Sequence, residues 1–297
     1  MIQLYALNLP RPPDAALGTH YTNDFTNERI RLMPIPASSL ASEQHLRMLW
    51  LAWPKKGSTT HAVATAPAPV RVLLCEKTDS ALNGARRETK GFDFERVGGF
   101  DSMTKYIIEA KRDAKERKIK TVVVDPLNFF ADSLMEECLY QSKSEKGNED
   151  GRKAHPEFTR RIKHIVNLLQ TIPAHLIVVN HYMEVGGDEA GDKPKSGPGI
   201  VPLMPNMASR SAVAAMFHDI VWFDVAPKDF GGGHNNRVFF TSSDGVWGPG
   251  CRSLAKTGVM PAHVGRFIEA MSEGKVNGAS VRKVGAPAKA QQPMVRR

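Results

Sequence analysis

Four places in the sequence carry polar residues directly after an apolar run, where they could bind a charged ligand. The first is Lys55-Lys56-Gly57-Ser58-Thr59-Thr60, which follows the run Leu49–Trp53. Two acids and a histidine close later runs: Glu76 after Val70–Cys75, Asp125 after Thr121–Val124, and Asn180-His181 after Leu176–Val179. An isolated acid in such a place is usually a turn or cap residue. The order of all four is therefore a more specific signal than any one of them.

The elements that must position these residues follow from the hydrophobic periodicity. Short apolar runs predict buried strands, and they alternate with segments in which apolar residues recur at helical spacing. The predicted helices are His61–Thr65, Thr104–Lys118, Phe129–Leu139, Pro156–Leu169 and Ala208–Phe217, and two further strands are predicted at Ile220–Val225 and Arg237–Ser242. This alternation predicts a mostly parallel sheet with helices on both faces. Ligands of such sheets bind beyond the carboxyl ends of the strands.

The remaining segments predict loops and terminal extensions. Residues 140–154 are polar and indicate a flexible loop, and residues 185–205 are rich in Gly and Pro and indicate a long irregular loop of a length that is often functional. Residues 1–42 predict an N-terminal arm, 43–272 the core domain, and 273–297 a basic, flexible tail.

Charge favours a polyanionic partner. The 297 residues contain 40 Lys and Arg against 31 Asp and Glu, a formal net charge of +9. The segment Lys275–Arg297 alone supplies six basic residues and no acid, so a basic tail on a neutral domain is the alternative explanation.

Three classes of protein are excluded by composition. The cysteines Cys75, Cys138 and Cys251 are too few and too scattered for a disulfide framework or a zinc cluster. No apolar run approaches the roughly 20 residues of a membrane helix, and the N-terminus lacks a signal-peptide pattern. We therefore expect no membrane association and a cytoplasmic location, the host cytoplasm if the gene belongs to a phage.

The order of the four strand ends resembles the RecA-like branch of P-loop ATPases, in particular the phage nucleotide-binding group that includes single-strand-annealing ATPases. The resemblance covers about residues 47–266. It implies a RecA-like P-loop core that binds ATP and Mg²⁺. It also implies self-association into rings or filaments, because such cores place the nucleotide between neighbouring subunits.

The same resemblance implies a role for each residue. Residues 55–60 would bind the nucleotide, with Thr59 and Asp125 holding Mg²⁺ through water. Glu76 would orient the attacking water and His181 would sense the γ-phosphate. Lys256 would bind a nucleotide, since the matching segment of the family can reach the phosphates of a neighbouring subunit. The DNA-binding residues would be Lys193 and Lys195 in the 183–206 loop, together with Arg210.

The loop departs from the P-loop pattern, which is Gly, four residues, then Gly-Lys-Ser/Thr. With Thr59 in the place of the hydroxyl residue, Ser58 stands where the lysine is expected and Ala52 where the first glycine is expected. Pro126 also follows Asp125, where a hydroxyl residue is usual. Either Lys55 or Lys56 restores the missing charge, or the site has lost hydrolysis and even ATP binding while the fold persists.

Two functions remain open at this point. The first is a phage-type RecA-like protein that binds ATP, hydrolyses it weakly or not at all, and acts on single-stranded DNA in recombination or replication. The second is a non-catalytic scaffold of RecA-like fold in an assembly such as a viral particle, favoured by the altered loop and the proline-rich arm before Arg47.

Overall fold

The protein is described from a computed structural model, in which residues 45–80, 82–89, 91–143, 147–185, 199–226, 237–242, 250–254 and 258–273 are placed well enough to describe. The predicted arm and tail lie outside these ranges, so the domain boundaries at residues 42 and 272 stay predictions. Within the described residues, no helix is both long enough and apolar enough to cross a membrane.

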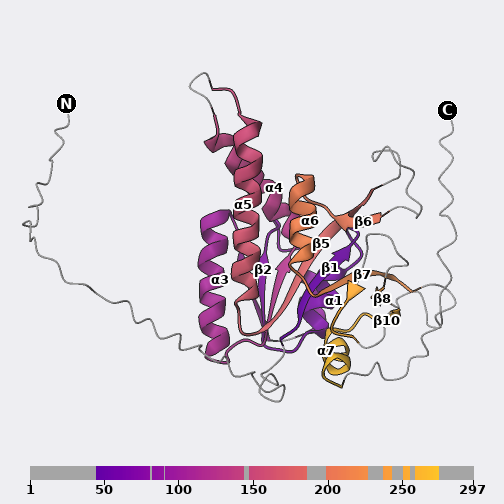
Figure 1. The fold of residues 1–297 in the computed structure, drawn as a ribbon. Coiled ribbons are helices and arrows are strands. Elements are labelled where there is room, and N and C mark those ends of the chain that lie inside the picture. Colours follow the sequence, from indigo (N-terminus) through magenta and orange to yellow (C-terminus); the bar gives the residue numbers. More distant parts are fainter. Residues whose placement is uncertain are drawn as a thin grey trace, which may run out of the picture. The chain divides into compact units, whose positions relative to one another are not determined.

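A single mostly parallel sheet organises the fold (Figure 1). Its strands lie in the spatial order β10-β8-β7-β1-β5-β4-β2-β3. The parallel strands are β1 (Arg47–Ala52), β2 (Val70–Leu74), β3 (Phe92–Arg96), β4 (Thr121–Asp125), β5 (His175–Val185) and β7 (Asp219–Val225). The antiparallel strands β8 (Arg237–Phe240) and β10 (Val259–Pro261) extend one side, β9 (Gly250–Cys251) pairs with β7, and β6 (Gly199–Pro202) pairs with β5.

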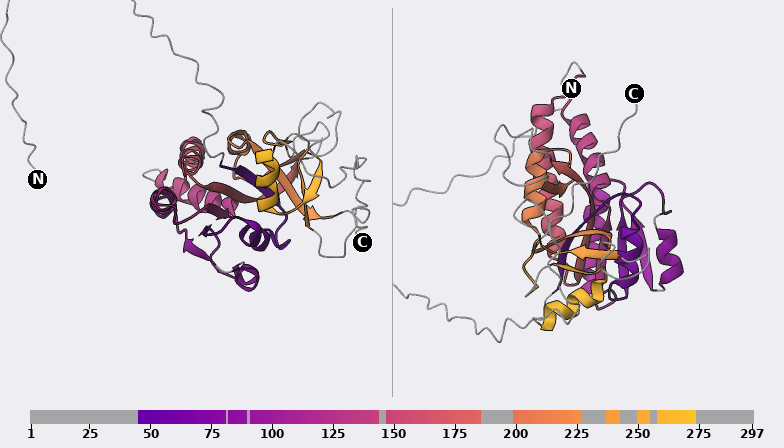
Figure 2. Two further views of the ribbon diagram at one scale, coloured as in Figure 1. Left: turned by 90° about the horizontal axis from the view of Figure 1, so that it is seen from below. Right: turned by 90° about the vertical axis from the view of Figure 1, so that its right-hand side faces the viewer.

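Helices cover both faces of this sheet, as the view from below shows (Figure 2). The first face, called the α1 face, carries α1 (Ser58–Thr65), α2 (Leu82–Glu88) and α7 (Val264–Glu273). The second, called the α3–α6 face, carries α3 (Phe100–Lys115), α4 (Leu127–Gln141), α5 (Gly151–Gln170) and α6 (Met207–Ala215). Because side chains alternate along a strand, each strand contributes to both cores: Met48 and Trp50 pack on the α1 face, and Leu49 and Leu51 on the other.

This architecture confirms the predicted fold class, an α/β domain of RecA-like type. The central strands are apolar throughout because both of their sides are buried, and β4 has no exposed position. Strand β5 lies between β1 and β4, so the strand that precedes the glycine loop and the strand that ends in Asp125 are separated by one strand.

The structure differs from the sequence prediction after residue 179. Strand β5 continues to Val185, and Tyr182–Val185 pair antiparallel with β6. The prediction of irregular structure throughout 185–205 was therefore wrong for Gly199–Pro202. The short β6 lies among glycines and prolines, which hide a four-residue strand from a search for periodic runs. The sequence analysis also assigned no element to α2, β3 or α7.

Candidate functional site

The loop between β1 and α1 exposes the N-terminus of a helix at the end of the central strand. Gly57 is the N-cap of α1 with φ of 82°, a left-handed conformation that glycine adopts without strain. No side chain caps this end. The first backbone N–H groups of α1 are therefore free of side-chain acceptors, and such groups bind anions, phosphate above all.

Thr59 and Asp125 meet beside this helix end. The Thr59 hydroxyl donates a hydrogen bond to the Asp125 carboxylate, with Oγ1 and Oδ2 2.6 Å apart. Asp125 is the last residue of β4 and is 2% exposed. Sequence analysis predicted both residues as Mg²⁺ ligands, and the structure brings them together across 66 positions of the chain.

Burial favours the protonated form of the carboxyl groups at this site. Burial raises the pKa of Asp125 to about 7, the nearby charge of Glu76 raises it further, and the hydrogen bond from Thr59 lowers it. Burial also raises the pKa of Glu76. Glu76 follows β2 and Asp125 ends the neighbouring strand β4, so the two acids lie near each other at this edge of the sheet. A bound cation would favour the charged form of both.

His181 lies on the same face of the sheet as Asp125. It pairs in register with Ala52 and has the same side-chain direction as Ile177 and Val179, which pack on the α1 face. Its backbone N–H donates to Asn128 Oδ1 at 3.2 Å, and the Phe129 ring contacts its imidazole edge-on. Burial lowers the pKa of His181, which favours the neutral ring.

Asn180 points to the opposite face and serves the hairpin instead. Its side-chain amide donates to the carbonyl groups of His181 and Leu203, at 2.6 and 3.3 Å. The residue is fully buried, and it thereby ties β5 to the segment that follows β6. Two successive residues of β5 therefore differ in their surroundings: His181 faces the α1 side, and Asn180 stabilises the β5–β6 hairpin.

The residues of the loop itself have different surroundings. Ser58, in the place of the P-loop lysine, is 8% exposed at the start of α1. The Lys56 ammonium group pairs with Asp224 of β7 at 3.2 Å, and Arg237 of β8 donates to the Lys56 carbonyl oxygen at 3.2 Å. Sequence analysis missed both partners. A signal existed only for Asp224, which is an acid near the end of an apolar strand like the other acids of this edge.

The other predicted site residues are not gathered at this edge by any described contact. Lys193, Lys195 and Lys256 lie outside the described residues. Arg210, on α6, donates from Nε to the Met204 carbonyl oxygen at 3.3 Å. Thr60 lies next to Gly84 of α2, which places the second helix of this face against the start of α1.

The residues of this edge can be compared with those that magnesium requires. Within the described residues, no group of three or more His, Cys, Asp or Glu could hold a metal. Mg²⁺ is usually bound by one or two protein oxygens together with substrate phosphates, and Thr59 and Asp125 supply such oxygens beside an uncapped helix. Position 58, at which the predicted register of the P-loop pattern places a lysine, is a serine.

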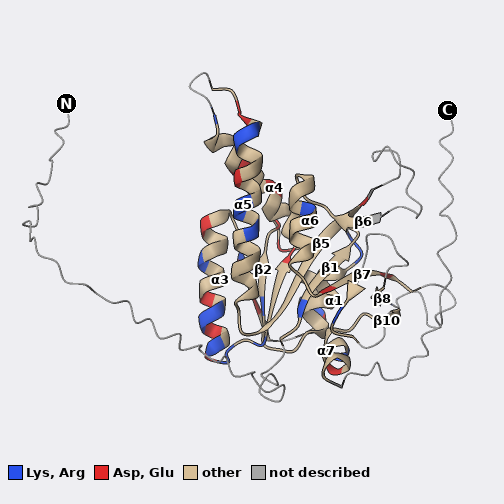
Figure 3. Ribbon diagram, in the orientation of Figure 1, with Lys and Arg blue, Asp and Glu red and all other residues tan. Residues whose placement is uncertain are grey.

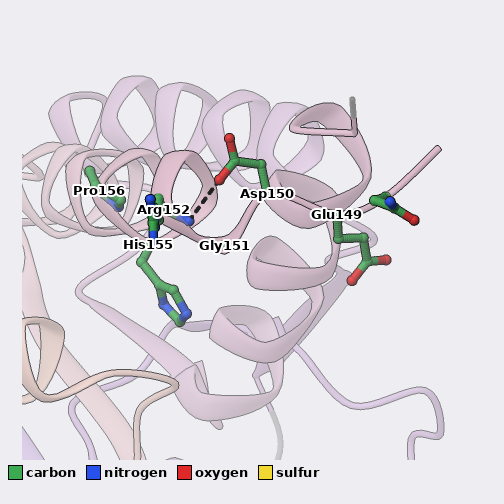
Figure 4. Close-up of a pocket in the computed structure, with 7 residues that line it drawn as sticks. Glu149, Asp150, Gly151, Arg152, His155 and Pro156 are labelled. Atoms are coloured by element: carbon green, nitrogen blue, oxygen red, sulfur yellow. Dashed lines mark hydrogen bonds between the residues drawn. The ribbon is translucent and has the colours of Figure 1, made fainter. Parts of the chain in front are cut away.

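A separate hollow lies at the far end of α5 (Figure 4). It is lined by one continuous stretch of chain, from Asn148 to Pro156. Asp150 caps the helix there by accepting a hydrogen bond from the Arg152 backbone N–H at 3.1 Å. The hollow is thus a fold in the chain at a capped helix start, and it shares no residue with the edge around Asp125.

Comparison with known proteins identifies a protein family and a number of similar solved structures, of which one is given below. The model of the family described as AAA domain matches residues 44–246, which is most of the chain. The crystal structure of the KaiC-like protein PH0186 from the hyperthermophilic archaeon Pyrococcus horikoshii OT3 is 10% identical, with a TM-score of 0.38 over 72% of this chain and 84% of that one. No curated protein matched the sequence.

Proposed function

Because the chain belongs to the AAA domain family, we propose that this RecA-like ATPase domain binds ATP with Mg²⁺ at the edge formed by α1, β2, β4 and β5. The observation that carries the proposal is the hydrogen bond from Thr59 to the buried Asp125, directly beside the uncapped start of α1. A hydroxyl and a carboxylate in that arrangement are the protein oxygens that a phosphate-bound Mg²⁺ requires.

Each residue of the edge has a defined part in this proposal. The N–H groups of the first turn of α1 receive the phosphate oxygens, and Thr59 and Asp125 hold the metal ion that accompanies them. Glu76, in its charged form, orients the attacking water and accepts a proton from it. His181 lies on the same face and contacts the terminal phosphate.

Hydrolysis is proposed to be weak or absent. In a P-loop the lysine neutralises charge that develops on the transferred phosphoryl group, and Ser58 carries no charge. Removing a single preorganised donor from such a transition state costs on the order of 10²–10³ in rate. We therefore propose that the serine lowers the rate of hydrolysis more than it lowers the affinity for the nucleotide.

Thermal unfolding with and without ATP and Mg²⁺ tests the binding proposal. Ligand at about 100 times its Kd stabilises a fold by about 2.7 kcal/mol, which for a domain of this size raises the Tm by roughly 5–10 °C. We expect Thr59→Val to abolish this rise, because it removes the hydroxyl and keeps the shape. Thr104→Val is the matched control: it removes a helix hydroxyl on α3 that bonds the Phe100 carbonyl oxygen.

The result also separates this function from the scaffold alternative. If the unchanged protein shows no shift at millimolar ATP and Mg²⁺, the nucleotide proposal fails and a non-catalytic scaffold becomes the better explanation. If Thr104→Val loses the shift as fully as Thr59→Val does, the effect is not specific to the edge.

We further propose that the domain acts on single-stranded DNA, as a phage-type recombination or replication protein that assembles into rings or filaments. The support is the net charge of +9 and the β5–β6 hairpin, which continues from the same edge as His181. The predicted DNA contacts Lys193 and Lys195 lie in the sequence between those two strands, and Arg210 follows on α6. Helix α3 carries both signs of charge in near balance (Figure 3), whereas α5 carries five Lys and Arg against one acid, Glu157.

A further inference from the structure

The two lysines that precede Gly57 are held in different ways, and the difference bears on which of them contacts phosphate. This inference rests on the nucleotide-binding function proposed above. Lys56 has a partner for its side chain and another for its backbone: its ammonium group pairs with Asp224, and its carbonyl oxygen accepts a hydrogen bond from Arg237. Both partners belong to strands on one side of β1, namely β7 and β8.

These two partners lie on the side of β1 that is remote from Asp125, the proposed magnesium ligand. In the sheet, β7 and β4 lie on opposite sides of β1. Asp224 also has the side-chain direction of Trp222, which packs on the α3–α6 face, whereas Asp125 has that of Val123, which packs on the α1 face. The Lys56 side chain therefore points toward β7 and the α3–α6 face, whereas Asp125 lies on the β4 side of β1 and on the α1 face.

The ion pair alone would not prevent Lys56 from moving, since both side chains are partly exposed, 38% and 23%, and such pairs contribute at most about 1 kcal/mol. The hydrogen bond from Arg237 restrains the loop more strongly, because it is made to the backbone of Lys56 rather than to its flexible side chain. Together the two contacts make Lys56 an anchor of the loop against β7 and β8.

Lys55 has the opposite character. It is exposed, and it forms no hydrogen bond or ion pair with a described residue. Its φ is 64°, a left-handed conformation that is uncommon for a residue with a side chain and costs free energy to maintain. The loop holds this strained residue two positions before the N-cap of α1, with its ammonium group uncommitted.

We infer that Lys55 supplies a cation that contacts the bound phosphates and strengthens nucleotide binding, without restoring the P-loop geometry on which hydrolysis depends. Lys56, Asp224 and Arg237 position the loop. Lysine has four rotatable bonds, so its charge reaches a phosphate from a neighbouring loop position that the P-loop pattern does not mark. These two roles account for the difference between the adjacent lysines, of which Lys56 is paired and Lys55 is exposed.

The experiment measures the affinity of a fluorescent ATP analogue with Mg²⁺, and the Tm of each variant, for Lys55→Asn, Lys55→Arg and Lys56→Met. Asparagine tolerates the left-handed conformation and lacks the charge, and arginine keeps the charge. We expect Lys55→Asn to weaken binding tenfold or more without lowering the Tm, and Lys55→Arg to restore most of the affinity. Lys56→Met should weaken binding two- to threefold, through a less firmly held loop.

Each other outcome overturns the assignment. If Lys56→Met weakens binding tenfold and Lys55→Asn does not, Lys56 is the phosphate contact. If neither variant weakens binding, or if Lys55→Arg binds as poorly as Lys55→Asn, no cation at position 55 takes part. If the unchanged protein does not bind the analogue, the proposed nucleotide function falls together with this inference, whereas the earlier outcomes leave that function standing.

Discussion

Asp125 is the residue at which stability and proposed function oppose each other. Its carboxyl group is buried, and burial raises its pKa to about 7, from 3.8 in water. Between these two pH values the unfolded chain has released the proton and the folded chain still binds it. Folding stability therefore falls as pH rises through this window, and it stays lower above pH 7. Perturbed pKa values cluster at functional sites, which supports the proposed role of Asp125 as a magnesium ligand.

Replacing Asp125 by Asn tests this opposition. Asparagine keeps an oxygen that accepts from Thr59 and carries no charge to desolvate, so we expect the Tm at pH 8 to rise by roughly 5 °C or more. The decline of stability between pH 4 and 7 should flatten, and the stabilisation by ATP and Mg²⁺ should disappear. Thermal unfolding across pH measures all three, with the exposed Glu149→Gln as control. A lower Tm for Asp125→Asn at pH 8 would contradict the buried-charge explanation.

At this scale the sequence reveals strand-end residues but not their partners. Glu76, Asp125 and His181 follow apolar runs, so their place at one edge could be predicted from the chain alone. Asp224 and Arg237 could not be assigned to the loop, because their contact with Lys56 depends on β7 and β8 lying beside β1. Spatial strand order is not encoded in local periodicity.

Among the elements, α1 and α2 pack so closely that one position determines their spacing. A Cβ added to Gly84 of α2 would overlap the Thr60 Oγ1 atom in the first turn of α1. Glycine is otherwise unfavourable inside a helix by about 1 kcal/mol relative to alanine. The close approach thus explains why α2 has a glycine in its interior.

Gly84→Ala is therefore expected to destabilise the protein and to weaken nucleotide binding, by displacing Thr60 and with it the neighbouring Thr59. In a Thr60→Ala background the overlap is gone, and the same Gly84→Ala change should then stabilise by up to about 1 kcal/mol through helix propensity. Denaturant unfolding of the four proteins of this double-mutant cycle measures the coupling. Additive effects would show that the two helices do not constrain each other at this point.

The elements also show why some were missed. Strand β3 alternates Phe92 and Phe94 with charged residues as a half-exposed outer strand, and α2 is only seven residues long. The helix is too short to show a helical period. The strand has only two apolar residues, so it lacks the continuous apolar run by which the central strands were recognised. The central strands and long helices, whose burial is continuous or strongly one-sided, were all predicted. The largest errors at their ends are in β5, which continues six residues beyond the predicted Val179, and in α5, which begins at Gly151 within the predicted loop 140–154.

Across the whole molecule, charge and core are separated along the chain. Both hydrophobic cores draw their buried residues from between Leu46 and Ala270, whereas six of the nine surplus positive charges lie in residues 275–297. Among the described residues, the two cores are therefore complete without a contribution from the basic segment, and the tail charges are available to test separately from the core.

We therefore expect the full chain to retard single-stranded DNA in a gel at low salt, with an affinity that falls steeply as salt rises. Each phosphate contact on a single strand contributes about 0.7 to the slope of log affinity against log salt. A chain cut to residues 1–273, which ends with α7, should keep the Tm of the full chain and lose up to about 4 of that slope, if all six tail cations contact phosphate. Equal slopes for the two chains would assign the contacts to the residues before the tail, among which the β5–β6 hairpin and Arg210 lie. Unaltered DNA mobility with the full chain at low salt would overturn the DNA proposal and leave the nucleotide site unaffected, because the two rest on different residues.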